Sequence, residues 1–77
     1  MEVDKYILEK EVIDGITALH LMRILLYEGV GLRGEEYYDG SWHPHQGVLS
    51  YMFDPSPGDF ITEEEAMEAI KYINENQ

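Results

Sequence analysis

The absence of cysteine from a chain of 77 residues is the strongest constraint on its fold. A domain this short buries only about 60 to 65% of its unfolded surface, so one hydrophobic core leaves a narrow stability margin. Disulfide bonds cannot supplement that core, and thiolate metal sites and cysteine nucleophiles are excluded. We therefore expect one domain over residues 1–77, in a reducing cytoplasm.

The apolar residues do not predict a membrane-spanning segment. The longest apolar stretch, residues 16–27, is interrupted by His20 and Arg23. It is also shorter than the roughly 20 residues that a helix needs to cross a bilayer. The N-terminal sequence MEVDKYILEKE is acidic and mixed, which is not typical of a secretory or transit peptide.

Residues 3–13 carry a pattern that fits two kinds of element. Val3, Ile7 and Leu8 fit a helical stripe, whereas Tyr6, Leu8 and Val12 share the parity of a strand. Lys10 interrupts the strand pattern. We favour a strand here and keep the helix as the alternative.

The sequence ITALHLMRILLYE, residues 16–28, predicts a helix. Asp14 is a good N-cap residue before it, and Gly29 stands at a typical C-cap position. Apolar residues cover nearly its whole circumference, which indicates burial on more than one side. Because so short a chain offers few other covering elements, residues 16–27 are a candidate homodimer interface.

The second half of the chain predicts a hairpin, a strand and a helix. In GEEYYDGSWHPH, aromatic residues flank Asp39-Gly40, a dipeptide typical of two-residue hairpin turns. GVLSYMF, residues 47–53, favours a strand covered on both faces, and DPSPGD favours a turn. Residues 61–77 predict an amphipathic helix, with Thr62 and Glu65 in capping-box spacing. The expected order is β-α-β-β-β-α, an α+β fold in which a small antiparallel sheet packs against two helices.

The charge is strongly and unevenly acidic. Five Lys and Arg stand against 16 Asp and Glu, a formal charge of 5 − 16 = −11. Direct binding to nucleic acid or to an anionic membrane needs a positive patch, so the expected partner is a basic protein. Between Gly34 and Ile70 there is no Lys or Arg. The carboxylates of that stretch are Glu35, Glu36, Asp39, Asp54, Asp59, Glu63, Glu64, Glu65 and Glu68.

Two interpretations of this acidity stay open. Acids in the first turn of a helix are favoured by the helix dipole by roughly 0.3 to 1 kcal/mol each, and an acidic face also confers solubility. Neither reason explains the like-charge pair Glu64 and Glu68, or the uncompensated acids of the hairpin and turn. The alternative is that a rigid array of carboxylates imitates the phosphates of nucleic acid.

Acidic residues with aromatic anchors are a composition suited to a protein inhibitor. In size and charge the chain resembles small acidic inhibitors of phages and mobile elements, such as anti-CRISPR proteins, restriction-nuclease inhibitors and the uracil-DNA glycosylase inhibitor. It is also similar to bacteriocin-nuclease immunity proteins. The resemblance rests on no shared motif and transfers no site residue. From its own sequence, the candidate partner-binding residues are Glu35, Glu36, Tyr37, Tyr38, Asp39, Trp42, Asp54, Asp59, Glu64 and Glu68.

The predicted hairpin also predicts a candidate zinc site. A two-residue turn at Asp39-Gly40 pairs Glu36 with His43, and strand alternation places His45 on the same side. Two imidazoles and a carboxylate can supply three Zn²⁺ ligands, with Asp39, His20 or water as the fourth. Without metal, neighbouring carboxylates favour protonated histidine and a pH-sensitive patch.

The sequence does not predict an enzyme. It lacks a recognisable nucleophile and base, and the glycine-rich GVGLRG, residues 29–34, lacks the Lys of a phosphate-binding loop. The expected function is an acidic inhibitor, encoded by a phage or mobile element, that binds the nucleic-acid groove of a host defence nuclease and blocks DNA loading. The alternative is an oligomerising adaptor or nuclease-immunity protein whose acidity serves mainly solubility.

Overall fold

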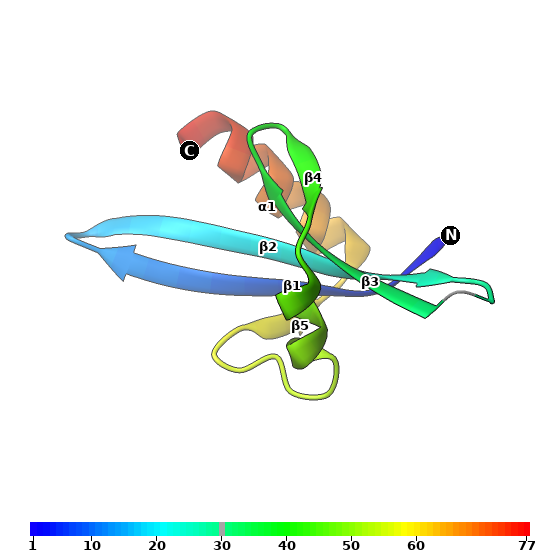
Figure 1. The fold of residues 1–77 in the computed structure, drawn as a ribbon. Helices are drawn as coiled ribbons and strands as arrows, with labels where there is room; N and C mark the ends of the chain where they lie inside the picture. Colours follow the sequence, from blue (N-terminus) through cyan, green and yellow to red (C-terminus); the bar gives the residue numbers. More distant parts are fainter. Residues whose placement is uncertain (30) are drawn as a thin grey trace.

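The computed structural model describes residues 1–29 and 31–77. The elements in chain order are β1 (Glu2–Ile13), β2 (Ile16–Tyr27), β3 (Gly31–Tyr38), β4 (Ser41–Pro44), the 3-10 helix η1 (Gln46–Tyr51), β5 (Asp59–Ile61) and α1 (Glu63–Asn76). The strands form one antiparallel sheet in the order β4-β3-β2-β1-β5. α1 packs on one face of the sheet and η1 on the other (Figure 1), so the α+β class is as predicted.

The predicted helix over residues 16–28 is wrong, because Ile16–Tyr27 forms the central strand β2. β2 pairs with β1 from Ile16 to Leu26 and with β3 from Leu21 to Tyr27. A strand that is apolar on both faces has the same residue types as a buried helix, so hydrophobic periodicity cannot separate them. The favoured strand over residues 3–13 is confirmed by β1.

The two Asp-Gly dipeptides form the same kind of turn. Asp14 and Gly15 have φ of 52° and 78°, and Asp39 and Gly40 have φ of 52° and 79°. Positive φ at both central residues matches the two-residue turn whose twist suits antiparallel strands. The hairpin predicted at Asp39-Gly40 is confirmed, and Asp14 turns a second hairpin rather than capping a helix.

β2 is buried on both faces because each face has its own cover. On one side, Leu19 and Leu21 pack with Tyr37 against Ala66, Ala69 and Ile73 of α1. On the other side, Met22 and Ile24 pack with Ile7 against Val48 of η1. The second layer that the sequence assigned to another copy is therefore supplied within the chain.

The strand predicted over residues 47–53 is wrong, because Gln46–Tyr51 forms η1. Its Val48 is fully buried and closes the smaller core. Gly34 permits this packing, since a Cβ there would lie 2.5 Å from the carbonyl oxygen of His45 and 2.9 Å from Cβ of Val48. In the GVGLRG stretch, residue 30 lies outside the described residues and residues 31–34 belong to β3.

α1 begins as predicted, with a capping box. Thr62 Oγ1 accepts a hydrogen bond from the Glu65 backbone N–H at 3.2 Å, and Glu65 Oε1 accepts one from the Thr62 N–H at 3.0 Å. Ala66, Ala69 and Ile73 form its buried face. Within residues 1–29 and 31–77, no helix is long and apolar enough to span a bilayer.

The β1–β2 hairpin extends beyond the rest of the sheet. β5 pairs only with Tyr6–Leu8, and β3 pairs with β2 no further than Leu21, so the distal part is a two-stranded arm (Figure 1). We call residues 9–20 the arm. It gives the molecule its elongated shape, with principal extents of 44 × 23 × 20 Å. At its tip, Val12, Ile13 and Ile16 are exposed by 67%, 55% and 71%.

Adjacent residues of β2 should be equally important for stability, because they face two different cores. Leu21→Ala and Met22→Ala are each expected to lower the free energy of unfolding by about 2 to 5 kcal/mol, the range for buried large-to-small changes. Urea denaturation measures both. Met67→Ala on the exposed side of α1 is the control and should change stability by less than about 0.5 kcal/mol. A cost below about 1 kcal/mol for either core variant would contradict burial on both faces.

Candidate partner-binding surface

Glu35 lies in a buried ion-pair cluster and not at the surface. It is 6% exposed and faces Arg23 across the β2–β3 pair. Its Oε1 accepts a hydrogen bond from Arg23 Nε at 2.8 Å and forms an ion pair with Arg23 Nη2 at 2.7 Å. Arg33 Nε lies 3.2 Å from Oε2 without the alignment of a hydrogen bond. Both arginines of the chain are therefore held by one carboxylate.

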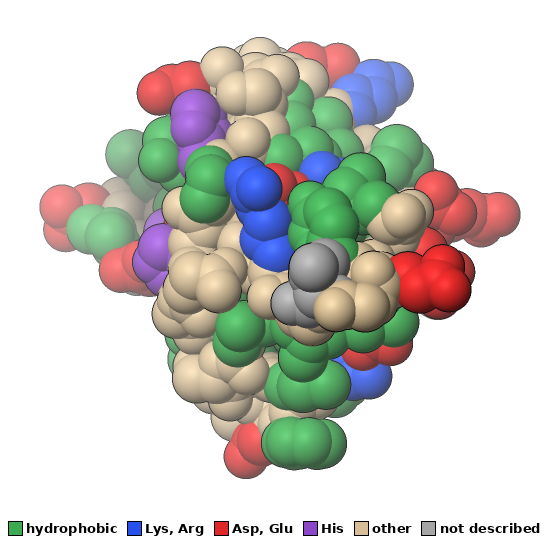
Figure 2. Space-filling model, turned by 45° about the vertical axis from the view of Figure 1, so that its right-hand side comes forward, with side chains coloured by type: hydrophobic (Ala, Val, Ile, Leu, Met, Phe, Trp, Pro, Cys, Tyr) green, Lys and Arg blue, Asp and Glu red, His purple; other side chains and the backbone are tan. Residues whose placement is uncertain are grey.

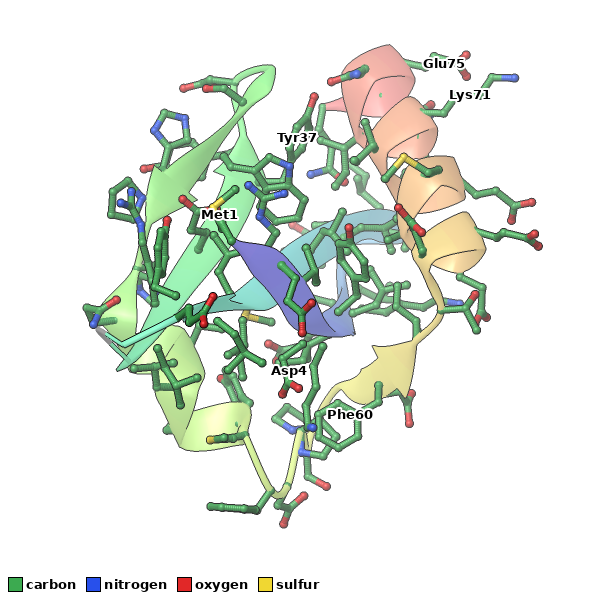
Figure 3. The ribbon with its side chains drawn as sticks, turned by 90° about the vertical axis from the view of Figure 1, so that its right-hand side faces the viewer. Met1, Asp4, Tyr37, Phe60, Lys71 and Glu75 are labelled. Atoms are coloured by element: carbon green, nitrogen blue, oxygen red, sulfur yellow. The ribbon has the colours of Figure 1, made fainter. Side chains whose placement is uncertain are left out.

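Two of the predicted aromatic anchors also belong to the interior. Tyr37 is 8% exposed, points toward α1 (Figure 3) and donates its hydroxyl to Asn74 Oδ1 at 3.0 Å. Trp42 is half-buried, with the Arg23 guanidinium 4.1 Å from its ring centroid and Tyr37 edge-on at 5.3 Å. Tyr37 and Trp42 thus contribute to the packing of the sheet against α1, and Glu35 and Tyr37 expose too little surface to be major contacts for a partner.

The hairpin brings Glu36 and His43 together as predicted, but not His45. Glu36 and His43 are cross-strand partners. β4 ends at Pro44 and His45 is the N-cap of η1, while the His45 N–H donates to the Gly34 carbonyl of β3 at 2.8 Å. The His43 ring stacks on Tyr38 at 3.9 Å between centroids and lies with Nε2 2.9 Å from the Tyr38 carbonyl oxygen.

Glu36 instead lies near His20. His20 Nδ1 is 3.7 Å from Glu36 Oε2, and His20 Nε2 is 2.9 Å from Glu11 Oε2. The described residues contain no group of three or more His, Asp or Glu arranged to hold a metal ion. Zinc binding by Glu36, His43 and His45 stays a prediction.

The remaining predicted acids lie in three separate places. Asp39 is at the tip of the β3–β4 hairpin, and Asp54 and Asp59 flank the loop at the opposite end of the molecule (Figure 1). Glu64 and Glu68 are on the exposed side of α1. The Ser56 N–H donates to Asp54 Oδ1 at 3.0 Å and lowers the pKa of that carboxyl, which keeps it ionised. Figure 2 likewise shows Asp and Glu side chains projecting at several separate points.

The exposed side of α1 carries the most regular array of carboxylates. Glu64, Glu68 and Glu75 share this side with Lys71, opposite the buried face of the helix. Figure 3 shows the Lys71 and Glu75 side chains directed away from the sheet. We call Glu64, Glu68 and Glu75 the helix carboxylates.

Comparisons with known proteins add no family. No family model, no curated protein and no solved structure matches this chain. The geometry of the described residues is therefore the basis for the proposals that follow.

The sequence interpretation missed the arm as a candidate functional feature. Val12 and Ile13 belong to the favoured strand over residues 3–13 and Ile16 to the predicted helix, whereas in the structure all three form an exposed apolar hairpin tip. The signal that could have found it was Asp14-Gly15 between two β-branched runs, which is as typical of a hairpin as Asp39-Gly40.

Removing the charge of Glu35 should destabilise the fold far more than the same change at its neighbour. Glu35→Gln is expected to cost about 3 kcal/mol, the lower end of the range for breaking a buried ion pair, because Arg33 keeps contact with water. Glu36→Gln is the matched control, with an expected cost below about 1 kcal/mol. Chemical denaturation of both variants tests this, and equal costs would contradict a structural role for Glu35.

Proposed function

We propose that this chain is a non-catalytic acidic inhibitor that binds the basic nucleic-acid-binding groove of a defence nuclease and blocks DNA loading. A phage or mobile element is the proposed source, and the host cytoplasm is the proposed site of action. The partner is a protein, with no direct contact to nucleic acid or membrane.

The observation that supports this proposal is the use of both arginines by the buried Glu35. Removing this cluster leaves 5 − 2 = 3 Lys and 16 − 1 = 15 carboxylates for the rest of the chain. The charge outside the cluster is therefore 3 − 15 = −12, more negative than the −11 of the whole chain. The Arg33 side chain remains 41% exposed, so this sum leaves out one partly exposed cation. Arg33 and three lysines still cannot neutralise 15 carboxylates, which favours a strongly basic partner.

The helix carboxylates suit the role of phosphate substitutes. Residues four apart on a helix are separated by about 6 Å along its axis. Phosphates of one DNA strand rise by about 3.4 Å each along the duplex axis, so every second phosphate lies about 7 Å further along that axis. A row containing Glu64 and Glu68 on a capped helix can therefore meet cations arranged for alternate phosphates. Tyr38, exposed by 46%, and Asp39 offer further contacts at the hairpin tip.

The alternative of an oligomerising adaptor or immunity protein stays a prediction. The homodimer proposed through residues 16–27 would need apolar side chains at the surface, whereas Leu21 and Leu25 are 0% exposed within a single chain. Leu21→Asp would therefore unfold the domain instead of separating two copies.

Reversing the charge of the helix carboxylates tests the inhibitor proposal. A panel of restriction and CRISPR nucleases is assayed for DNA binding by mobility shift as this protein is added. We expect at least one nuclease to lose DNA binding, and Glu64→Lys with Glu68→Lys to weaken that inhibition by about tenfold or more. Inhibition should also fall as salt rises, because the contacts are ionic.

The matched control reverses two charges elsewhere. Glu2→Lys with Glu28→Lys changes the net charge equally at two exposed positions away from α1. This control should inhibit within about twofold of the native chain if the position of the charge matters. Equal losses in both double variants, or full inhibition by the α1 variant, would contradict the role of the helix carboxylates.

A further inference from the structure

The two long edges of the arm differ, because the edge of β2 is hydrogen-bonded to other residues and the edge of β1 is open within the described part of the chain. On the β2 side, Gln77 imitates a neighbouring strand, because its side-chain Oε1 accepts from the Leu19 N–H at 2.8 Å and its Nε2 donates to the Leu19 carbonyl at 3.3 Å. The Tyr72 hydroxyl donates to the Thr17 carbonyl at 3.4 Å. Tyr72 of α1 and the following Gln77 therefore occupy the outward N–H and C=O of Leu19 and the C=O of Thr17 on β2, beyond the end of β3.

These contacts also determine the direction of the backbone groups on β1. In an antiparallel pair, the N–H and C=O of one residue point to the same side of its strand. In two directly opposed residues, these groups either all point toward the partner strand or all point away from it. Leu19 and Thr17 point away from β1, and their register partners are Lys10 and Val12. The N–H and C=O groups of Lys10 and Val12 consequently point away from β2, toward the outer edge of the sheet.

No described residue occupies that outer edge. β5 pairs with Tyr6, Ile7 and Leu8 and extends no further along β1. Among residues 1–29 and 31–77, no hydrogen bond reaches the backbone of Lys10 or Val12 from outside the hairpin. An open strand edge of this kind is a template for a further strand, which natural proteins usually cover or blunt.

The surroundings of the open edge favour a basic strand with apolar residues. Beside the Asp59 end of β5, a hollow of about 490 Å³ is lined by Leu8 and Ile61 together with Lys10, Asp59 and Glu65. The exposed apolar tip of the arm lies at the other end of the same edge. Around the edge, the acids Glu9, Glu11, Asp14, Asp59 and Glu65 stand against Lys10, a local charge of 1 − 5 = −4.

A second copy of the chain fits the edge less well. Two-fold pairing of two β1 strands centred on Lys10 or Glu11 would oppose Lys10 to Lys10 or Glu11 to Glu11, which is unfavourable. Each copy would also bring its own charge of −11. The complementary occupant is a cationic segment of another protein.

We propose that the outer edge of β1 beyond Leu8, from Lys10 to Val12, binds an extended basic segment of a partner protein as an additional β-strand. Backbone hydrogen bonds to Lys10 and Val12 supply the pairing, and the hollow beside Leu8 and Ile61 receives an aliphatic or arginine side chain. This surface is distinct from the helix carboxylates, and the inference does not depend on the partner being a nuclease.

The probe is a short synthetic peptide in which arginine and valine alternate, added to the full isotope-labelled chain. NMR hydrogen exchange should show the amides of Lys10 and Val12 exchanging at least about tenfold more slowly with peptide than without it. The same peptide with glutamate in place of arginine should not bind, since the edge is acidic.

Proline substitutions on the two edges provide a matched pair. Val12→Pro removes an outward N–H and should weaken peptide binding by about tenfold or more. Thr17→Pro makes the same change directly across the arm, on the edge toward α1, and should bind within about twofold of the native chain.

Three results would overturn the proposal. These are unchanged exchange at Lys10 and Val12 with bound peptide, equal losses for both proline variants, and equal binding of the acidic peptide. A native chain that sediments as a dimer and becomes monomeric on Val12→Pro would assign the edge to a second copy instead. The exchange measurement uses the native chain, so it stands even if a proline variant is poorly folded. Failure of this test leaves the charge-reversal experiment on α1 unaffected.

Discussion

Burial of β2 on both faces is the constraint on which the rest of the structure depends. A strand with apolar side chains in both directions cannot lie at the surface of a sheet, so both layers must be built from what remains of the chain. α1 covers the face of Leu21, and η1 covers the face of Met22. Most of α1 and the short η1 are thereby committed to covering, and neither core is large. The domain holds together without disulfides because its central strand contributes to two cores at once.

The buried cluster of Glu35 with Arg23 and Arg33 links this packing to the charge of the surface. An isolated carboxylate at that depth would be costly, and the two arginines make it acceptable by pairing with it. Arg23 also lies over Trp42, so one guanidinium joins the ion pair to the aromatic packing beside α1. The pairing also affects the charge distribution, because Arg23, whose side chain is only 18% exposed, does little to balance carboxylates elsewhere on the surface.

The arm combines with that acidity to separate two kinds of recognition. Carboxylates on α1 act at a distance and depend on charge, whereas an open strand edge requires a partner backbone at hydrogen-bond distance. Gln77 and Tyr72 occupy the β2 edge, and no described residue does the same for β1 beyond Leu8. The acids around that edge also oppose pairing between like copies. The proposed basic partner can thus be selected by charge on α1 and by backbone pairing on β1.

The sequence by itself determined the features that depend on local chemistry. The turn at Asp39-Gly40 and its pairing, the Thr62–Glu65 capping box and the α+β class are predicted by residues within a few positions of one another. Only the tertiary structure decided what depends on distant neighbours. Ile16–Tyr27 is a strand because β1 and β3 flank it, although its composition fits a buried helix equally well. Gln46–Tyr51 is η1 and not a strand because it covers Ile7, Met22 and Ile24 next to Gly34. The sequence predicts that Glu35 is a surface acid, because both of its arginine partners lie outside the acidic stretch of residues 34–70. Only the pairing of β2 with β3 brings Arg23 and Glu35 together.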